Sequence, residues 1–306
     1  MRLLISLLIC FIPLLSKEFN YKLKPIKLSN NSYYFYGKEE YFSNKNGGNI
    51  SNTAFIETDK SVILIDTGSS FNYGKQLKKA IAKVTNKPIK YVINTHHHPD
   101  HFLGNNAFKD STIFATQFTA DEIETNGNLY IENLVNLVGS AMTDTSVKKV
   151  DKILNKKVMD FDGYKLHFIY LSGHTEDDLV IYDENTKILY ASDLVFNHRA
   201  LATPHANLDK WIESLNKLKN IDFKLCFPGH GLVFENKKAI EENIKYLKTI
   251  RKNINYGLKN GLDVFEVLDL KVPKDIRGFS IFEQEYERSI INLYNKKENI
   301  VNKKLY

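Results

Sequence analysis

The sequence predicts an α+β fold, a four-layer sandwich of two mixed β-sheets flanked by helices. Strand-like and helix-like segments occur in two successive sets, and each set closes with helices, as expected for two sheets that are each covered on one face. Polar residues suited to metal binding follow several apolar strand-like runs, where loops held by a rigid sheet carry function. With 306 residues, 43% of them hydrophobic, the chain can bury a sizeable core in one large domain or two small ones.

The first residues are typical of a secretory signal peptide. Met1 and Arg2 form a short basic start, and the apolar run Leu3–Leu15 is too short to span a membrane, which takes about 20 residues. Ser16 is a small residue suited to cleavage, so we expect residues 1–16 to be removed and the protein to be periplasmic or secreted. The alternative is an uncleaved N-terminal anchor, and the protein would contact a membrane only in that case.

The first set of elements follows a lead-in with short aromatic runs over residues 17–50, which predict edge strands. Asn49–Glu57 and Ser61–Asp66, separated by a polar turn, have a hairpin pattern. Lys75–Val84 has its apolar residues on one face and its lysines on the other, which predicts an amphipathic helix. The rest of this set is a buried strand at Ile89–Ile93, a short helix at Asn105–Lys109, a strand at Thr112–Ala115 and a helix at Phe118–Val138.

The second set is predicted to begin with strands within Val147–Tyr170 that turn at Asp162 and Gly163. Asp178–Tyr182 and Lys187–Ala191 form a second hairpin pattern. Apolar runs at Lys165–Leu171, Ile188–Ala191 and Leu225–Phe227 predict further strands, and Asp209–Leu218 and Lys237–Asn253 predict helices.

No repeat, low-complexity tract or linker divides the chain, so we expect one domain over residues 17–256. Residues 257–306 are charged and mainly helical in pattern, and they predict a helical C-terminal extension packed on the same domain. The apolar patch expected to make that contact consists of Val264, Phe265, Val267 and Leu268.

Charge and cysteine content argue against two classes of protein. The 42 basic and 36 acidic residues give a formal charge of +6, but no basic stripe interleaved with aromatic residues stands out. We therefore expect a small-molecule substrate and no nucleic-acid binding. Cys10 lies in the leader and Cys226 in a predicted strand, so neither a disulfide nor a thiolate zinc site is expected.

Four candidate metal ligands lie close together after the strand predicted at Ile89–Ile93. They are His96, His98, Asp100 and His101, in an H-x-H-x-D-H arrangement. No single face of a helix or strand would present all four, but a tight turn at the intervening proline would arrange them around a point. Imidazole and carboxylate groups suit zinc, with bonds of about 2.0–2.2 Å. The first two would serve one ion and the last two a second ion; the alternative is a surface loop that binds metal adventitiously.

Suitable partners recur downstream, each after an apolar strand-like run. His174 follows the strand predicted to end at Leu171, Asp193 the strand predicted to end at Ala191, and His230 the run that ends at Phe227. Loops at the ends of strands are held by the sheet and often carry function. The recurrence favours a built metal site over adventitious binding.

These segments resemble the five motifs of the metallo-beta-lactamase superfamily, with Asp66 in Ile65–Gly68 as the first motif. Order, spacing and flanking glycines match over about residues 45–235. The resemblance implies the αβ/βα sandwich fold and metal-dependent hydrolysis. It also implies two metal sites, with His96, His98 and His174 on one ion, Asp100, His101 and His230 on the other, and Asp193 bridging them.

The same resemblance implies two zinc ions and a metal-bridging hydroxide that hydrolyses a small ester, thioester or lactone. Asp100 and Asp193 would be the catalytic carboxylates. The donors also suit iron, so the ligand set leaves both metals open. In the best-known zinc beta-lactamases the position of Asp193 is a cysteine, which weakens the prediction of a beta-lactam substrate and leaves a beta-lactamase as an alternative.

Two residues near the motifs are candidates for supporting the ligands. Ligating imidazoles usually donate their second N–H to a neighbouring group, and Asp66 and Thr95 are suitably polar. For Asp66 the alternative is a simple turn residue before Gly68. His97 lies between ligands, and we expect it to point away from the metals.

Three further candidates, His198, Arg199 and His205, lie in the loop 196–207 that follows Asp193. They would lie near the mouth of the site and could contact an anionic substrate. The alternative is an ordinary solvated loop.

Four stretches also resemble the quinoprotein relay system zinc metallohydrolases: Gly47–Asn52, Thr95–Phe108, Ser192–Trp211 and Phe282–Arg288. That group consists of exported proteins associated with periplasmic quinoprotein dehydrogenases and sulfur-oxidation systems. The resemblance implies a periplasmic redox-pathway partner. It also keeps a second function open, that of a metal-binding accessory protein of such a pathway with little turnover.

Overall fold

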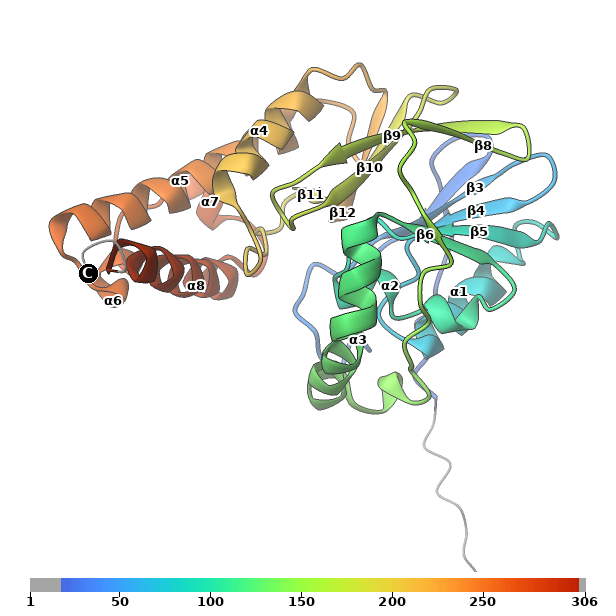
Figure 1. Ribbon diagram of the computed structural model, residues 1–306, viewed down its shortest axis with the longest axis horizontal. Helices are drawn as coiled ribbons and strands as arrows, with labels where there is room; N and C mark the ends of the chain where they lie inside the picture. Colours follow the sequence, from blue (N-terminus) through green and yellow to red (C-terminus); the bar gives the residue numbers. More distant parts are fainter. Residues whose placement is uncertain (1–17, 303–306) are drawn as a thin grey trace, which may run out of the picture.

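Two mixed β-sheets lie face to face at the centre of the protein, with helices on their outer faces (Figure 1). The computed structural model describes residues 18–302. The first sheet has the strand order β1 (Ile26–Lys27), β2 (Ser32–Phe35), β3 (Thr53–Glu57), β4 (Val62–Ile65), β5 (Ile89–Ile93), β6 (Thr112–Ala115) and β7 (Lys152–Ile153). The second has the order β12 (Leu225–His230), β11 (Ile188–Phe196), β10 (Asp178–Asp183), β9 (Tyr164–Leu171) and β8 (Val158–Phe161).

Both sheets change from antiparallel to parallel pairing, which makes them mixed. In the first sheet the change occurs at β4, which pairs antiparallel with β3 and parallel with β5. In the second it occurs at β11, which pairs antiparallel with β10 and parallel with β12. The predicted fold class is confirmed.

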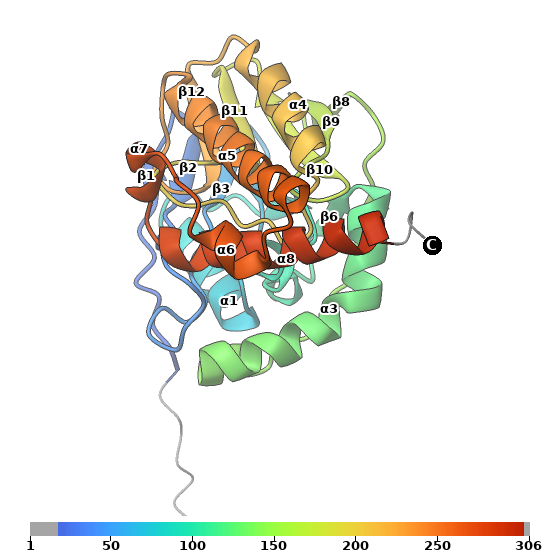
Figure 2. The same cartoon turned by 90° about the vertical axis from the view of Figure 1, so that its left-hand side faces the viewer.

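Helices cover the outer faces of the two sheets (Figures 1 and 2). Those near the first sheet are α1 (Phe71–Ile81), α2 (Pro99–Phe102), α3 (Gln117–Val138) and the short 3-10 helices η1 (Asn105–Ala107) and η2 (Gly139–Met142). Those near the second sheet are α4 (Leu208–Lys219) and α5 (Lys238–Asn260). The chain continues into α6 (Val264–Leu268), α7 (Lys274–Arg277) and α8 (Phe282–Asn302).

Three layers of apolar side chains hold the sandwich together. Between the sheets, Ile63 and Ile93 of the first sheet share a buried cluster with Ile181 and Tyr190 of the second. A second cluster lies under α1 and α3, and a third, which includes Trp211, lies between the second sheet and α4, α5 and the C-terminal helices. Burying each large apolar side chain contributes about 1.5–3 kcal/mol. The sheets therefore form a rigid base for the loops at their ends.

Two helices differ from their predicted bounds, and α1 also ends at Ile81, before the predicted Val84. Helix α1 begins at Phe71, earlier than predicted, because the Ser70 hydroxyl accepts a hydrogen bond from the Tyr73 backbone N–H at 3.1 Å and caps the helix. Helix α5 continues until Gly261, which adopts a left-handed φ of 69°. The domain boundary predicted at residue 257 therefore falls inside this helix.

Most predicted strands are present, but several of their ends were wrong. The strand predicted from Asn49 begins only at Thr53, and that predicted to end at Ala191 continues to Phe196. No strand forms over residues 147–151. The turn predicted at Asp162 and Gly163 connects β8 and β9.

The C-terminal helices pack against α5, and α8 lies beside α5 and α6 (Figure 2). In the apolar patch predicted for this contact, Val267 is buried, and Val264 and Leu268 are partly buried against the same core. The prediction for Phe265 was wrong, because its side chain is 70% exposed. Val267 and Leu268 lie three and four residues after Val264 and share the helix face that packs against the core, whereas Phe265 lies at the edge of that face and projects into solvent.

Among residues 18–302, no helix combines the length and apolar character needed to cross a membrane. The signal peptide predicted at residues 1–16 and the cysteine within it lie outside the described part of the chain. Cys226 is fully buried in β12, as its sequence context predicts.

Candidate metal centre

The predicted metal ligands meet at one edge of the sandwich, where strands of both sheets end. Strands β4, β5 and β9 end just before Asp66, the cluster His96–His101 and His174, while β11 carries Asp193 and β12 ends at His230. Around Ser192, whose φ is 46°, the register of β11 against β12 shifts. Segments far apart in the sequence thus bring seven donor side chains together.

A proline organises the histidine cluster. His98 has extended backbone and occupies the position before α2, and Pro99 is the first residue of that helix. Proline suits this position because its fixed φ matches a helix and its missing N–H would have no partner there. The backbone changes from extended to helical at this point, which separates His96 and His98 from Asp100 and His101. The predicted turn is present.

His96, His98, His174 and Asp193 form the first donor group, and their ligand atoms lie within 4.8 Å of one another. His98 Nδ1 lies 2.8 Å from His174 Nε2, which in turn lies 3.3 Å from Asp193 Oδ2. His96 Nε2 lies 3.8 Å from the same carboxylate oxygen. Three imidazole nitrogens and one carboxylate oxygen are ligand types that zinc takes.

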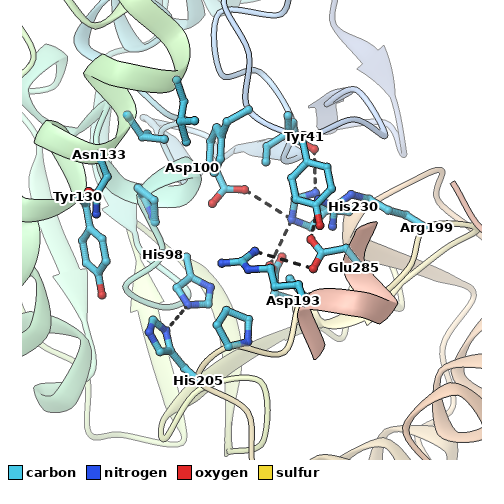
Figure 3. Close-up of a pocket in the computed structure, with 18 of the residues that line it drawn as sticks. Tyr41, His98, Asp100, Tyr130, Asn133, Asp193, Arg199, His205, His230 and Glu285 are labelled. Atoms are coloured by element: carbon cyan, nitrogen blue, oxygen red, sulfur yellow. Dashed lines mark hydrogen bonds and ion pairs between the residues drawn. The ribbon is translucent and has the colours of Figure 1, made fainter. Parts of the chain in front are cut away.

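Asp100, His101 and His230 form the second donor group, also within 4.8 Å. Asp100 Oδ2 lies 3.6 Å from His101 Nε2 and 3.5 Å from His230 Nε2. Asp193 faces this group as well, with Oδ1 3.2 Å from His101 Nε2. Its Oδ2 lies 3.2 Å from His230 Nε2 (Figure 3). Asp193 therefore lies between the two groups, in the position of a bridging ligand.

The donor atoms fit divalent metal ions because the protein leaves them without other partners. His96 Nε2, His101 Nε2 and Asp193 Oδ1 are buried and make no hydrogen bond among the described residues. Buried polar atoms in proteins nearly always have a partner, so an unpaired set that converges on one place needs an explanation. Metal coordination supplies one, since each of these atoms offers a lone pair.

Neighbouring groups hold the outer nitrogens of several rings. His101 Nδ1 lies 2.7 Å from Asp66 Oδ2, and the backbone N–H and hydroxyl of Thr95 donate to the same carboxylate at 2.9 and 2.8 Å. The Thr95 hydroxyl also lies 3.1 Å from His96 Nδ1. His230 Nδ1 lies 2.8 Å from the Ile50 carbonyl oxygen. A carboxylate or carbonyl at Nδ1 fixes the tautomer that turns the Nε2 lone pair inward.

His205, which was predicted to lie near the mouth of the site, contacts the outer nitrogen of His98. Its Nδ1 lies 2.8 Å from His98 Nε2 (Figure 3), whereas His174 contacts the other nitrogen of that ring, Nδ1. His97 is buried and belongs to neither of these two donor groups, although its ring offers a nitrogen within 4.8 Å of ligand atoms of His98 and His205. Its Nε2 lies 4.0 Å from Glu122 Oε2.

Burial decides the charge of three histidines in the first group. It lowers the pKa of His96 and His98 well below the usual value and the pKa of His174 to about 3. At neutral pH these rings are therefore neutral and keep a lone pair for a metal ion.

The electrostatics of the second group are different. Burial lowers the pKa of His101, but Asp193, Asp100 and Asp66 outweigh burial and raise that pKa well above its usual value. Burial raises the pKa of Asp193, but His230 and His101 outweigh it and hold that pKa well below the usual range. The carboxylates thus concentrate negative charge at this place, which a divalent cation would satisfy instead of a proton.

A cavity of about 810 Å³ opens in front of the donor groups. Helix α3 lines one wall with Tyr130, Asn133, Leu134 and Leu137, which share one helix face. The opposite side carries residues of α8 and of the loops that precede β3 and follow β11, and Figure 3 shows the donor groups between the two sides. This size is in the range of small-molecule sites.

Of the three loop residues predicted near the mouth, Arg199 and His205 line the cavity, but His198 does not. The side chain of His198 is exposed and its backbone adopts a left-handed φ of 58°. Its carbonyl oxygen accepts a hydrogen bond from Ser280 N–H, which ties this turn to the C-terminal segment. The prediction of a substrate contact for His198 was therefore wrong.

Several cavity residues were not predicted: Tyr41, Phe42, Tyr130, Asn133, Glu285 and Arg288. For α3, the helical spacing of Tyr130, Asn133, Leu134 and Leu137 was a usable signal of a shared face. For Tyr41 and Glu285 no local signal exists, because their place depends on how distant segments pack.

Comparison with known proteins agrees with this geometry. A family model described as the metallo-beta-lactamase superfamily matches residues 46–230. A linear primary-alkylsulfatase from a Pseudomonas sp. is 23% identical over 76% of this chain, and the chain spans about half (52%) of that relative. A metallo-beta-lactamase type 2 from a Bacillus sp. is 32% identical over 60% of this chain and 67% of the relative.

Solved structures agree at the level of the fold. A metallo-beta-lactamase from Pontibacter korlensis superposes with a TM-score of 0.61 at 21% identity, covering 74% of this chain and 99% of that structure. The residues left uncovered are consistent with a chain that extends beyond the shared sandwich.

Proposed function

Because this chain belongs to the metallo-beta-lactamase superfamily, we propose that it is a dinuclear zinc hydrolase of small esters, thioesters or lactones. The observation that supports this most strongly is the pair of donor groups that share Asp193. Relatives named as a sulfatase and a lactamase support hydrolysis as the reaction type. Iron stays open as the metal, since imidazole and carboxylate ligands suit both elements.

Bound ions at these groups would acidify a coordinated water toward a pKa of about 7 and stabilise the oxyanion of the attacked carbonyl. Asp193, whose carboxylate lies 3.3 Å from His174 of the first group and 3.2 Å from His230 of the second, would set the spacing of the two sites. Asp100, which faces both His101 and His230, would complete the second site beside the cavity. The cavity walls would orient the substrate and limit access of bulk water.

A beta-lactamase is the second candidate, and the Bacillus relative at 32% identity favours it. Asp193 argues against it, because the best-known zinc beta-lactamases have a cysteine at the corresponding position. The only described cysteine, Cys226, is buried in β12 and belongs to neither donor group.

We also propose that the protein is exported and belongs with the quinoprotein relay system zinc metallohydrolases. Support comes from the leader at residues 1–16 and from the stretches Gly47–Asn52 and Phe282–Arg288. A periplasmic redox-pathway partner, or an accessory role in such a pathway, would follow. Mass spectrometry of the native protein should find a mature N-terminus near residue 17, and intact Met1 in a soluble cytosolic fraction would reject export.

Metal analysis of the purified protein, combined with a panel of esters, thioesters, lactones and beta-lactams, tests the main proposal. We expect two zinc ions per chain, and fewer in His96→Ala and His230→Ala. His167→Ala is the matched control, because His167 lies at the surface beside Glu184 and outside both groups.

The outcomes separate the candidates. A stoichiometry of one ion that persists in His230→Ala would reject the dinuclear site. Efficient carbapenem turnover would favour the beta-lactamase. Full metal occupancy without turnover of any substrate would favour the accessory role.

A further inference from the structure

Two arginines and one glutamate that are not among the predicted metal ligands form a charged cluster on the cavity wall. Arg199 lies in the loop after β11, while Glu285 and Arg288 lie on α8. Both α8 residues lie outside residues 46–230, the segment that the family model matches. The α8 part of the cluster is therefore a feature of this chain beyond the segment that the family model matches, whereas Arg199 lies within that segment.

We propose that Arg199 and Arg288 bind an anionic group of the substrate, so that the proposed hydrolase acts on anionic molecules with an apolar body. This inference rests on the proposed function, because it names the substrate class of the same cavity. Three observations carry it: unused donors on Arg199, an incomplete charge balance, and apolar walls beside the arginines.

Arg199 is buried but lacks hydrogen-bond partners for most of its guanidinium. Its side chain is 3% exposed, and its Nε and Nη1 make no hydrogen bond among the described residues. The nearest acidic atom, Glu285 Oε1, lies 3.9 Å from Nη2, beyond hydrogen-bond distance. A buried guanidinium that is not fully paired is unfavourable, so an anionic group held at the cavity face of Arg199 would offset a charge that Glu285 does not pair at hydrogen-bond distance.

Glu285 lies between the two arginines and cannot neutralise both. Its side chain is 1% exposed, and its Oε2 lies 3.8 Å from Arg288 Nη1. The Arg288 side chain is 47% exposed, so it presents its charge to the cavity and to solvent. Two guanidinium groups against one carboxylate leave one positive charge on this wall. The other lining carboxylates, Asp100 and Asp193, contact the histidines of the donor groups instead.

The remaining lining offers apolar surface for the rest of the molecule. Leu134 and Leu137 of α3 line the cavity together with Phe42 and Pro204. Leu137 is 54% exposed and lines the cavity, so a bound apolar group would cover it. The positively charged arginines and the apolar wall together suit a ligand that has an anionic group and an apolar body.

The arrangement also places the bond to be hydrolysed. In Figure 3, Arg199 and Glu285 lie on one side of the pocket, Tyr130 and Asn133 lie on the other, and Asp100, His98 and Asp193 lie between them. Such a molecule would bind with its anionic group at the arginines and its apolar body at α3. The bond to be hydrolysed, between these two ends, would then lie next to the donor groups.

Binding of two probes that differ only in charge tests the proposal without turnover. The probes are 1-octanesulfonate and the neutral methyl octyl sulfone, titrated calorimetrically into metal-loaded protein. We expect the wild type to prefer the sulfonate, and Arg288→Gln to weaken sulfonate binding about tenfold while leaving sulfone binding unchanged. Arg277→Gln is the control, because it removes the same charge from an exposed C-terminal position that does not line the cavity.

A wild type without preference for the sulfonate, or an Arg288→Gln variant that keeps the preference, would overturn the proposal. Repeating the titration after the metal has been removed with a chelator identifies the source of any preference for the sulfonate. A preference due to the arginines persists without metal, whereas one due to bound metal ions is lost. A preference that only chelation abolishes would assign the anion to the metal centre. Ester turnover without charge preference would leave the proposed hydrolysis intact and reject only the anion site.

Discussion

His205 contacts the outer nitrogen of a candidate metal ligand, and we expect its loss to weaken metal binding. His98 Nε2 lies 2.8 Å from His205 Nδ1, so a neutral His98 that offers Nδ1 to the metal donates its Nε2–H to His205. Removing such a partner typically lowers metal affinity by about 10- to 100-fold. Competition with a fluorescent zinc chelator should show this loss in His205→Ala.

The conservative variant His205→Asn separates positioning from simple packing. The asparagine side-chain oxygen reaches a similar position to Nδ1 and can accept the same hydrogen bond, so zinc affinity should be largely restored. His167→Ala, at the surface, should leave the affinity unchanged. Equal losses in His205→Ala and His205→Asn would contradict a role for this hydrogen bond.

At the scale of elements, the close approach of β12 to β11 holds Asp193 in place. A Cβ atom at Gly229 would lie 1.8 Å from Asp193 Oδ1 and 2.8 Å from the Asp193 backbone nitrogen. Gly229→Ala must therefore displace the carboxylate that faces both donor groups. We expect the metal content to fall below two ions per chain, measured by elemental analysis.

The matched control is Gly278→Ala, whose added Cβ would meet only ordinary contacts of 3.5 Å or more. Its metal content should equal that of the wild type. Circular dichroism and a thermal melt show whether Gly229→Ala keeps the fold, since a carboxylate at the end of a side chain moves more easily than two strands. Full metal occupancy in folded Gly229→Ala would contradict the bridging position of Asp193.

At the scale of the whole molecule, metal binding should stabilise the fold, because the donor groups join loops from both sheets. A ligand that binds only the folded state stabilises it by about 2.7 kcal/mol at 100 times its dissociation constant. For a chain of this size, about 1 kcal/mol shifts the melting temperature by about 2–4 °C. Chelation should therefore lower the melting temperature by several degrees, measured calorimetrically.

The control for that experiment is His96→Ala, which lacks a ligand of the first group. Chelation should lower its melting temperature by less than that of the wild type. An identical shift in both proteins would mean that the stabilising ions bind elsewhere.

The sequence by itself determined the fold class and the candidate ligand set, because both depend on short-range patterns. Strands end shortly before His96 and His174 and at His230, and strand ends of one sandwich meet at its edges. Residue type then indicates the chemistry, because imidazole and carboxylate groups that recur in this order favour a built metal site over adventitious metal binding. For this reason the seven predicted ligands lie together in the structure.

Only the tertiary structure decided what surrounds those ligands. Tyr41, Glu285 and Arg288 reach the cavity from segments that lie far from the motifs in the sequence, and His198, close to them, turns away. The sequence pattern of an amphipathic helix such as α8 indicates that one face is buried, but it does not indicate which neighbouring element covers that face. The cavity wall, and with it the charge that selects a substrate, depends on long-range packing that no local pattern encodes.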